Sequence, residues 1–352
     1  MKKQSVPTLK IAATYIGTVV GAGFATGQEI LQFFAGFGIT GLWGIALTTF
    51  LFILFGFIIM ELGQKLYAQS HLEIIKASGG KILGFVMDAI ITFFLFGSLT
   101  AMAAGTGALF SQQFGIPGLW GSLLMAVLAG ATVLTGIGGV INAISVIVPF
   151  LLVSVVGISV FSIVKAPPDM AVIAGSGENG LIHNWFLAGI LYVSYNTVMS
   201  ISVLGPLGAH SKDKRAILAG AVLGGSGLGL GAVMIFFALC GNLSQVRHLE
   251  VPMSYIAGNI SPVVQIIYTV VLIAEVYTTA VGALYGFAAR VADMEKNPGR
   301  GRTVVVGTAA AAFFASMLGF SNLVKYLYPL VGYGGIVLLL SLLWGRLREP
   351  TD

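Results

Sequence analysis

Charged residues are scarce in this sequence. Asp, Glu, Lys and Arg make up 9% of its 352 residues, whereas 57% are hydrophobic. A soluble globular protein carries about 25% charged residues, so this composition excludes a soluble fold of this length. A G-X-Y period and a heptad pattern of charges are also missing, which excludes collagen and coiled coil. The composition instead predicts an all-α protein whose helices cross a membrane many times.

Cysteine and paired histidines are lacking too. The single cysteine, Cys240, excludes a disulfide framework, and none of the four histidines has the H-x-x-x-H spacing of a metal site. No HExxH motif, mid-membrane histidine or Ser/His pair is present, so we expect no enzyme, no catalytic residue and no cofactor. No cleavage motif follows the apolar run that begins at Leu9, and we expect this run to remain as the first span.

Long apolar runs fill most of the chain. A helix that spans the bilayer needs about 20 mainly apolar residues, and ten runs approach this length. They are Leu9–Gly36, Gly41–Tyr67, Ile82–Phe114, Leu119–Thr135, Val140–Val164, Asn184–Gly208, Ala216–Cys240, Ser261–Arg290, Val304–Leu318 and Val324–Trp344. No connection is long enough for a soluble domain, so residues 1–352 are expected to form a single transmembrane domain.

The basic residues test this count. With ten crossings and an inner N-terminus, the inner segments hold fifteen of the 18 lysines and arginines, and the outer segments hold Lys165, Arg247 and Lys325. This asymmetry follows the positive-inside rule and predicts a multi-pass protein of the cell membrane with both termini in the cytoplasm. Because the basic residues are dispersed over five loops, the net charge of +5 does not indicate a nucleic-acid partner.

Helix-breaking residues recur at matching places in two halves of the chain. Ten spans divide into two repeats of five, about 9–165 and 183–346, and an odd number of spans per repeat makes the second inverted. Gly17-Thr-Val-Val-Gly21-Ala-Gly23 interrupts the first span, and Ser194-Tyr-Asn196, followed by Gly205-Pro206, lies at the corresponding depth of the sixth. We therefore predict that helices 1 and 6 are broken, a pattern typical of transporter sites. Glycines four apart can also serve helix packing.

Two acidic residues lie inside the spans, one at the bilayer centre and one next to the break in the first span. Glu275 is 14 residues from Ser261 and 15 from Arg290, and therefore falls at the bilayer centre. A charge there costs about 2.5–3.5 kcal/mol even on the lenient insertion scale, which favours a role in an ion site or a proton relay. Glu29 lies two residues after Gly27, and we expect it to face the outer vestibule.

This arrangement resembles a known family. The two repeats of five spans, with breaks in the first and sixth, resemble the LeuT-type fold of the amino acid–polyamine–organocation superfamily over nearly the whole chain. Gly17-Thr-Val-Val-Gly21-Ala-Gly23 is similar to its G-S-x-x-G-x-G break, and Tyr192-Val-Ser-Tyr-Asn196 with the basic stretch His210–Arg215 is similar to its sixth helix and inner loop. Within the superfamily, the chain most resembles the bacterial YkvI-like membrane proteins.

The resemblance implies a set of binding residues. The sodium site of the superfamily uses first-helix carbonyls, here those of Gly17 and Val20, and two adjacent hydroxyl residues of the eighth helix, here Thr278 and Thr279. The implied solute site comprises Gly21, Ala22, Gly23, Ser194, Tyr195 and Asn196. Glu275 stands where a small or apolar residue is expected, so coupling to sodium and coupling to a proton both stay open. Glu275 and Glu29 are the expected coupling or gating residues.

The resulting hypothesis is a cation-coupled secondary transporter, with sodium favoured over a proton, that works by alternating access. Its solute would be small, an amino acid or a related amine, and a sodium ion is the only bound ion expected. The expected partners are this solute and the lipid bilayer, with no nucleic acid and no obligate protein partner. The alternative is a membrane amino-acid sensor of the same fold that binds its ligand without transporting it.

Overall fold

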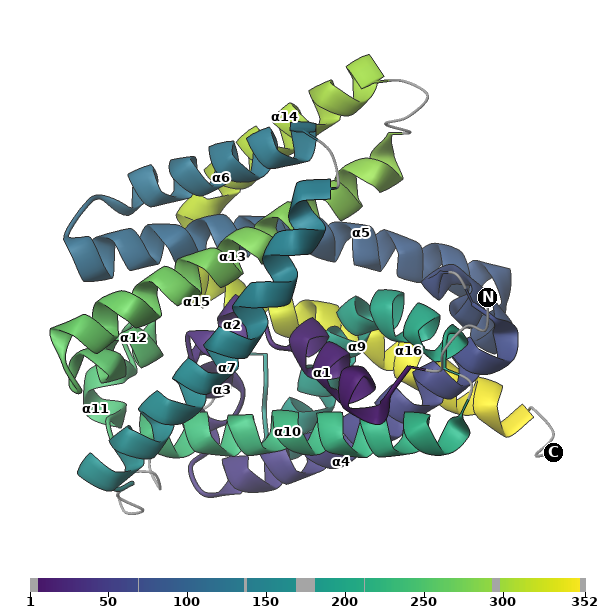
Figure 1. Cartoon of the computed structure of the whole chain (residues 1–352), viewed down its shortest axis with the longest axis horizontal. Helices are drawn as coiled ribbons and strands as arrows, with labels where there is room; N and C mark the ends of the chain where they lie inside the picture. Colours follow the sequence, from purple (N-terminus) through teal and green to yellow (C-terminus); the bar gives the residue numbers. More distant parts are fainter. Residues whose placement is uncertain are drawn as a thin grey trace.

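The computed structural model describes residues 6–68, 70–135, 138–168, 181–211, 213–292 and 298–348. These residues form helices joined by short connections (Figure 1). The long helices are α4 (Thr40–Leu66), α5 (His71–Phe114), α6 (Gly118–Thr135), α7 (Gly138–Lys165), α9 (Trp185–Ala209), α10 (Lys214–Cys240), α13 (Pro262–Val291), α14 (Pro298–Ala315) and α16 (Tyr328–Arg348). The short ones are α1 (Thr8–Val19), α2 (Ala22–Ala25), α3 (Gln28–Phe33), η1 (Ala35–Phe37), α11 (Leu243–Val246), α12 (Pro252–Gly258), η2 (Ser316–Leu318), α15 (Phe320–Asn322) and the π-helix η3 (Leu323–Leu327).

The helices account for the predicted crossings. Within the described residues, eight helical stretches are long and apolar enough to cross a membrane. The other two predicted crossings are α7, whose segment Phe150–Lys165 is a shorter apolar helix, and the first one, which is split into α1, α2 and α3. The third crossing begins after a kink at Gly80, where φ is 82°, in agreement with the predicted start at Ile82.

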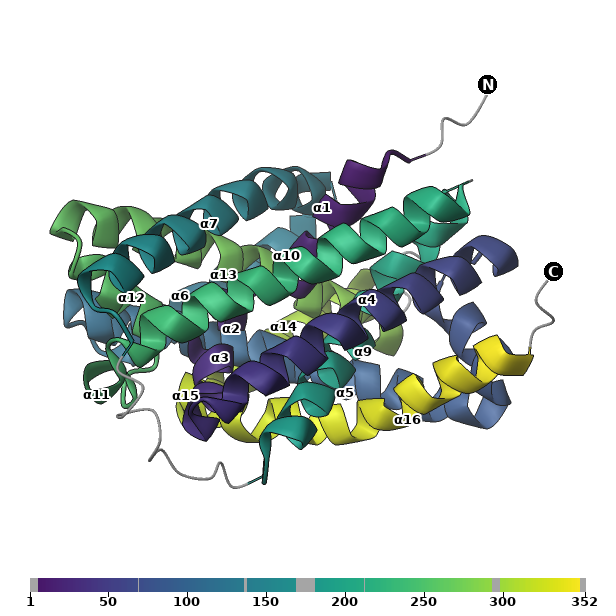
Figure 2. The ribbon, with the colours of Figure 1, turned by 90° about the horizontal axis from the view of Figure 1, so that it is seen from below.

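The crossings alternate in direction along the bundle. Helices α4, α9, α13 and α16 end, and α5 and α10 begin, at the end of the bundle where both chain termini lie, on the right in Figures 1 and 2. We call this the terminus end and the other the opposite end. The sixth crossing therefore runs against the first, as an inverted arrangement of two five-helix halves requires. Residues 169–180, between the two predicted repeats, lie outside the described residues.

The first crossing is broken, as predicted. Helix α1 stops at Val19, and the extended backbone of Val20 and Gly21 precedes α2. The last four carbonyls of a helix have no partner in the same helix, so those of residues 17–20 are free to bind something else. A second interruption follows at Gly27, whose φ of 80° an L-residue rarely adopts. The first crossing thus exposes polar backbone within the membrane.

Neighbouring groups satisfy the freed backbone beyond the break. The hydroxyl of Thr26 donates to the carbonyl of Gly23 at 3.0 Å, and the Tyr268 hydroxyl donates to that of Ala25 at 2.5 Å. The N–H of Met253 donates to the carbonyl of Thr26 at 2.9 Å. Lipid could not replace these bonds, so α2 is stable only where other helices enclose it.

The predicted break in the sixth crossing is wrong. Helix α9 continues from Trp185 to Ala209 without interruption through Ser194 and Asn196. The polar side chains find partners while the backbone stays helical: the Asn196 amide donates to the Tyr192 carbonyl at 2.9 Å, one turn back. Pro206 lies in the last turn of α9, and the helix continues through it to Ala209.

Candidate functional site

A pocket of about 290 Å³ lies beside the break in the first crossing. Helices α1–α3, α5, α9 and α13 and the first residue of α16 form its wall. Every residue predicted to bind the cation or the solute lines it, with the exception of Ser194: Gly17, Val20, Gly21, Ala22, Gly23, Tyr195, Asn196, Thr278 and Thr279. Glu29 and Glu275 line it as well. Residues from both halves of the chain thus meet at one cavity.

Ser194 does not belong to this wall. Its side chain is buried, and its hydroxyl donates to the carbonyl of Gly332 on α16 at 2.5 Å. Tyr195 and Asn196 are the next residues of α9 and do line the pocket. Each residue of a helix is turned about 100° from the one before it, so Ser194 and Asn196, which are two residues apart, point to nearly opposite sides of α9. Ser194 joins α9 to α16.

The sequence predicts that Glu29 faces an outer vestibule, and the structure shows that it does not. Its side chain is 5% exposed and lies inside the pocket, where its Oε2 accepts a hydrogen bond of 2.9 Å from the Tyr192 hydroxyl. The left-handed turn at Gly27 directs α3 so that this carboxyl folds back over Gly23. A Cβ atom at Gly23 would collide with the carboxyl and displace it from this place.

Glu275 brings a second carboxyl to the pocket. The residue is 3% exposed, and its Oε2 has no hydrogen-bond partner in the described part of the chain. The hydroxyl of Thr278 donates to the carbonyl of Glu275 at 2.9 Å, and Thr279 lines the same wall. A buried carboxyl without partners is costly unless it takes up a proton or meets a cation. This oxygen is therefore available for an occupant of the pocket.

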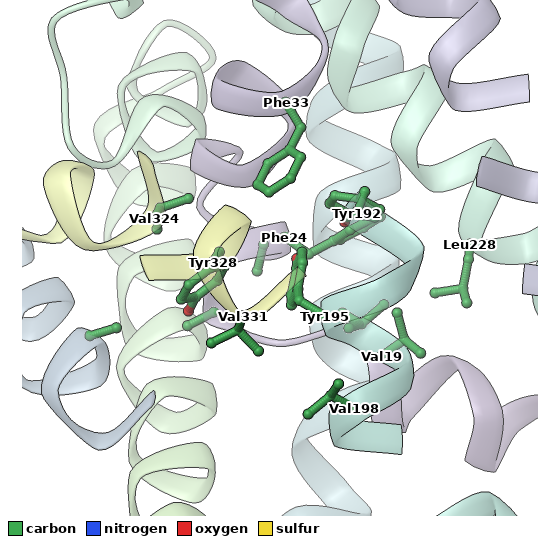
Figure 3. Close-up of a cluster of buried hydrophobic side chains, with 14 of the residues drawn as sticks. Val19, Phe24, Phe33, Tyr192, Tyr195, Val198, Leu228, Val324, Tyr328 and Val331 are labelled. Atoms are coloured by element: carbon green, nitrogen blue, oxygen red, sulfur yellow. The ribbon is translucent and has the colours of Figure 1, made fainter. Parts of the chain in front are cut away.

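Aromatic rings form another wall, of which the sequence predicted only Tyr195. Phe94, Tyr195 and Tyr328 line the pocket from three helices, with ring centroids 5.0–6.1 Å apart. Figure 3 shows Tyr195 on α9 and Tyr328 on the neighbouring segment within one buried cluster. Phe94 and Tyr328 lie in apolar runs that contain many aromatics, and nothing in their spacing separates them from ordinary core residues.

The pocket opens toward the terminus end. Val203 lines it although its side chain is 41% exposed, and Ser202 and Gly282 are exposed lining residues too. These residues lie in the parts of α9 and α13 nearest the terminus end, whereas Ala22 and Glu29 at the deep end are buried. The exposed part of the pocket lining therefore lies toward the terminus end.

At the opposite end, polar contacts close the bundle. The Gln28 amide on α3 donates to the Ser321 hydroxyl on α15 at 2.5 Å, and Gln32 approaches the same hydroxyl at 3.4 Å. Glu250, which precedes α12, accepts hydrogen bonds from the backbone of Phe320 and Ser321. Burial nevertheless raises the pKa of the Glu250 carboxyl above its usual value. The start of the tenth crossing is thus tied to α3 and to the segment before α12.

Ion pairs join helices near the terminus end. Glu61 on α4 is buried and pairs with Lys214 at 2.5 Å and with Arg346 at 3.3 Å, which links α4 to α10 and α16. Asp88 on α5 pairs with Arg290 on α13 at 3.4 Å. Each pair joins helices that are distant in sequence.

Comparison with known proteins gives the fold. No family model matches the chain. It is 28% identical over 347 residues to the uncharacterized membrane protein YkvI of Bacillus subtilis (strain 168), covering 97% of both chains, and 28% identical over 333 residues to the uncharacterized protein YyaD of the same organism, covering 93% of this chain and 94% of YyaD.

Two solved structures show how far the architecture is shared. MhsT in complex with L-phenylalanine matches with a TM-score of 0.65 at 16% identity, over 97% of this chain and 90% of MhsT. The inward facing conformation of Mhp1 matches with a TM-score of 0.63 at 14% identity, over 97% of this chain and 74% of Mhp1. At these identities the likeness establishes the fold, and the chain has the LeuT-type fold of these transporters.

Proposed function

We propose that this chain is a secondary transporter in which a cation, sodium in preference to a proton, drives the movement of a small solute by alternating access. The observation that carries the proposal is the single pocket at the break of the first crossing. Predicted cation and solute residues from both halves of the chain line it, and its exposed lining residues lie toward the terminus end. A volume of about 290 Å³ suits a solute the size of an amino acid or a related amine.

The proposed cation site uses oxygen atoms from two helices. The free carbonyls of Gly17 and Val20 at the end of α1 would meet the hydroxyls of Thr278 and Thr279 on α13. Carbonyl and hydroxyl oxygens suit a hard monovalent cation, and a nearby Glu275 carboxyl would strengthen the site or, by taking up a proton, replace it. No cofactor and no catalytic step enter this scheme.

The proposed solute site lies next to it. The backbone of Gly21, Ala22 and Gly23 would approach the solute closely, because an extended backbone and two glycines leave space there. Tyr195 and Asn196 would contact it from α9, and Glu29 would form the deep end.

In alternating access, the pocket would close at one end of the bundle and open at the other. The pocket is now reached from the terminus end, so access from the opposite end requires the contacts of Gln28 and Gln32 with Ser321 to separate. The basic residues predict that the terminus end is cytoplasmic and that the membrane is the cell membrane. The structure would then represent the state open to the cytoplasm.

Uptake into proteoliposomes tests the coupling. We expect solute uptake driven by a sodium gradient, and we expect Thr279→Ala to raise the sodium concentration for half-maximal uptake by about tenfold, since one oxygen ligand is lost. Thr303→Ala, the same change on an exposed turn of α14, serves as the control and should leave uptake unchanged.

Other outcomes would redirect the proposal. Uptake that follows a pH gradient and ignores sodium would assign the coupling to a proton. Unchanged sodium dependence in Thr279→Ala would remove the hydroxyl pair from the site. Saturable binding without any flux would instead support a membrane sensor of the same fold.

A further inference from the structure

The charge of the pocket is one-sided. Among the described residues that line it, Glu29 and Glu275 carry the only carboxyls, and none is a lysine, arginine or histidine. Both residues line the cavity and are buried, and one oxygen of the Glu275 carboxyl has no hydrogen-bond partner in the described part of the chain. Two carboxyls in a low-dielectric site need protons or positive charge from an occupant. One monovalent coupling cation can neutralise the charge of only one of the two carboxylates.

The carboxyl of Glu29 occupies the place beside the helix break. It lies against Gly23 so closely that even a methyl group there would collide with it. The Tyr192 hydroxyl fixes its other oxygen at 2.9 Å. A solute with a carboxylate of its own would have to bring that group to a surface where a carboxyl already lies. Like charges at such short range in a buried site repel strongly.

The remaining wall favours positive charge. The rings of Phe94, Tyr195 and Tyr328 come from α5, α9 and α16 and lie next to one another, with the Tyr195–Tyr328 centroids 5.0 Å apart. Aromatic faces attract ammonium groups, most strongly when water is excluded. The hydroxyl of Tyr195 lies beside Glu29 without a hydrogen bond of good geometry, and so it can accept one from an ammonium group.

We propose that the solute is a small organic cation, an ammonium compound without a carboxylate, which binds between the Glu29 carboxyl and the rings of Phe94, Tyr195 and Tyr328. The inference rests on the proposed function only in taking this pocket as the solute site. Of the two solute classes left open by the proposed function, an amino acid and an amine, this inference selects the amine. Glu275, on the other side of the pocket, stays with the coupling cation.

Matched ligands test the charge preference directly. Each of two amino acids, L-leucine and L-phenylalanine, is compared with the amine that lacks its carboxylate (isoamylamine and 2-phenylethylamine) and with the acid that lacks its amino group (4-methylpentanoate and 3-phenylpropionate). Because ligand binding raises the melting temperature of a protein, the readout is the melting temperature of the purified full chain in detergent at a constant sodium concentration. We expect at least one amine to raise it and neither its amino acid nor its acid to do so at equal concentration. Stabilisation by an amino acid equal to or greater than that by its amine would overturn the proposal.

Variants assign the binding groups. Glu29→Gln keeps the size of the side chain and should weaken amine binding by about tenfold or more, since a bond to a charged group is lost. Tyr328→Phe keeps the ring and should retain binding, whereas Tyr328→Leu should weaken it. The melting temperature of each variant without ligand establishes that it is folded, and unaltered amine binding in folded Glu29→Gln and Tyr328→Leu would reject this site.

Flux measurements separate this inference from the proposed function. Amine binding without amine flux in proteoliposomes would leave the charge preference standing and reject transport. Flux of an amino acid in preference to its amine would leave transport standing and reject the charge preference.

Discussion

Replacing Glu275 by glutamine is expected to lower cation-dependent uptake severely. Glu275 is 3% exposed, lies near the middle of α13 and lines the pocket, and one oxygen of its carboxyl has no hydrogen-bond partner among the described residues. Glutamine has nearly the same shape but can neither carry negative charge nor release a proton. Whether the driving ion is sodium or a proton, it loses the carboxyl that lies on the same helix as Thr278 and Thr279. Uptake at a fixed gradient should fall about tenfold to a hundredfold, as is usual when a bond to a charged group is removed.

The fold should survive this change, which makes the result interpretable. Neutralising a buried carboxyl removes a desolvation cost, so the melting temperature without ligand should stay constant or rise. Glu73→Gln is the matched control, because Glu73 lies on the exposed first turn of α5, away from the pocket. Undiminished uptake with an unaltered ion requirement in Glu275→Gln would show that this carboxyl is not part of the coupling.

The break in the first crossing could be predicted from the sequence because its cause is local. Gly17, Gly21 and Gly23 lie mid-span, and three glycines within seven residues weaken a helix even though Ala22 favours one. Free backbone in lipid must then be enclosed by protein, which is why polar residues of other spans could be expected nearby. Glu275 and Thr278 both line the pocket at the break. For Glu275 this was expected because a mid-span charged residue has to face the protein interior, and for Thr278 it was expected from the family resemblance.

The sixth crossing shows where such reasoning fails. Serine and asparagine were taken to signal an unwound helix, but their side chains can bond to their own helix or to a neighbouring one without disturbing the backbone. Asn196 donates to Tyr192 on the same helix, and Ser194 donates to Gly332 on α16. Which of these outcomes occurs depends on the carbonyls that surround the helix. These are set by tertiary packing, not by the local sequence.

The position of Glu29 depended on a single backbone angle. Counting residues along an ordinary helix places this side chain beyond the break, toward the outer surface. The left-handed turn at Gly27 instead directs the carboxyl back over Gly23. The sequence indicates that a glycine can adopt this turn but not that it does, so the pairing of Glu29 with Tyr192 could not be foreseen.

A leucine at Gly208 is expected to prevent α9 from packing on α4 and to destabilise the whole bundle. A Cβ atom at Gly208 would collide with the backbone of Met60, and one at Gly63 would collide with the backbone of Gly205. The two helices therefore touch backbone to backbone, as small residues permit in membrane proteins. Because the obstacles are backbone atoms, a side chain fits only if the helices separate. The cost should exceed about 3 kcal/mol, the upper part of the usual range for overpacking.

The same substitution elsewhere provides the control. Gly157 on α7 has no atom within 4 Å of the position that a Cβ would take, so Gly157→Leu should leave the melting temperature nearly unchanged. Gly208→Leu should lower it by roughly 10 °C or yield no folded protein, as measured by thermal unfolding in detergent. Equal melting temperatures for the two variants would mean that the α4–α9 contact is not essential. A loss confined to Gly208→Leu would instead identify α4 as the support on which α9 holds Tyr192, Tyr195 and Asn196 at the pocket.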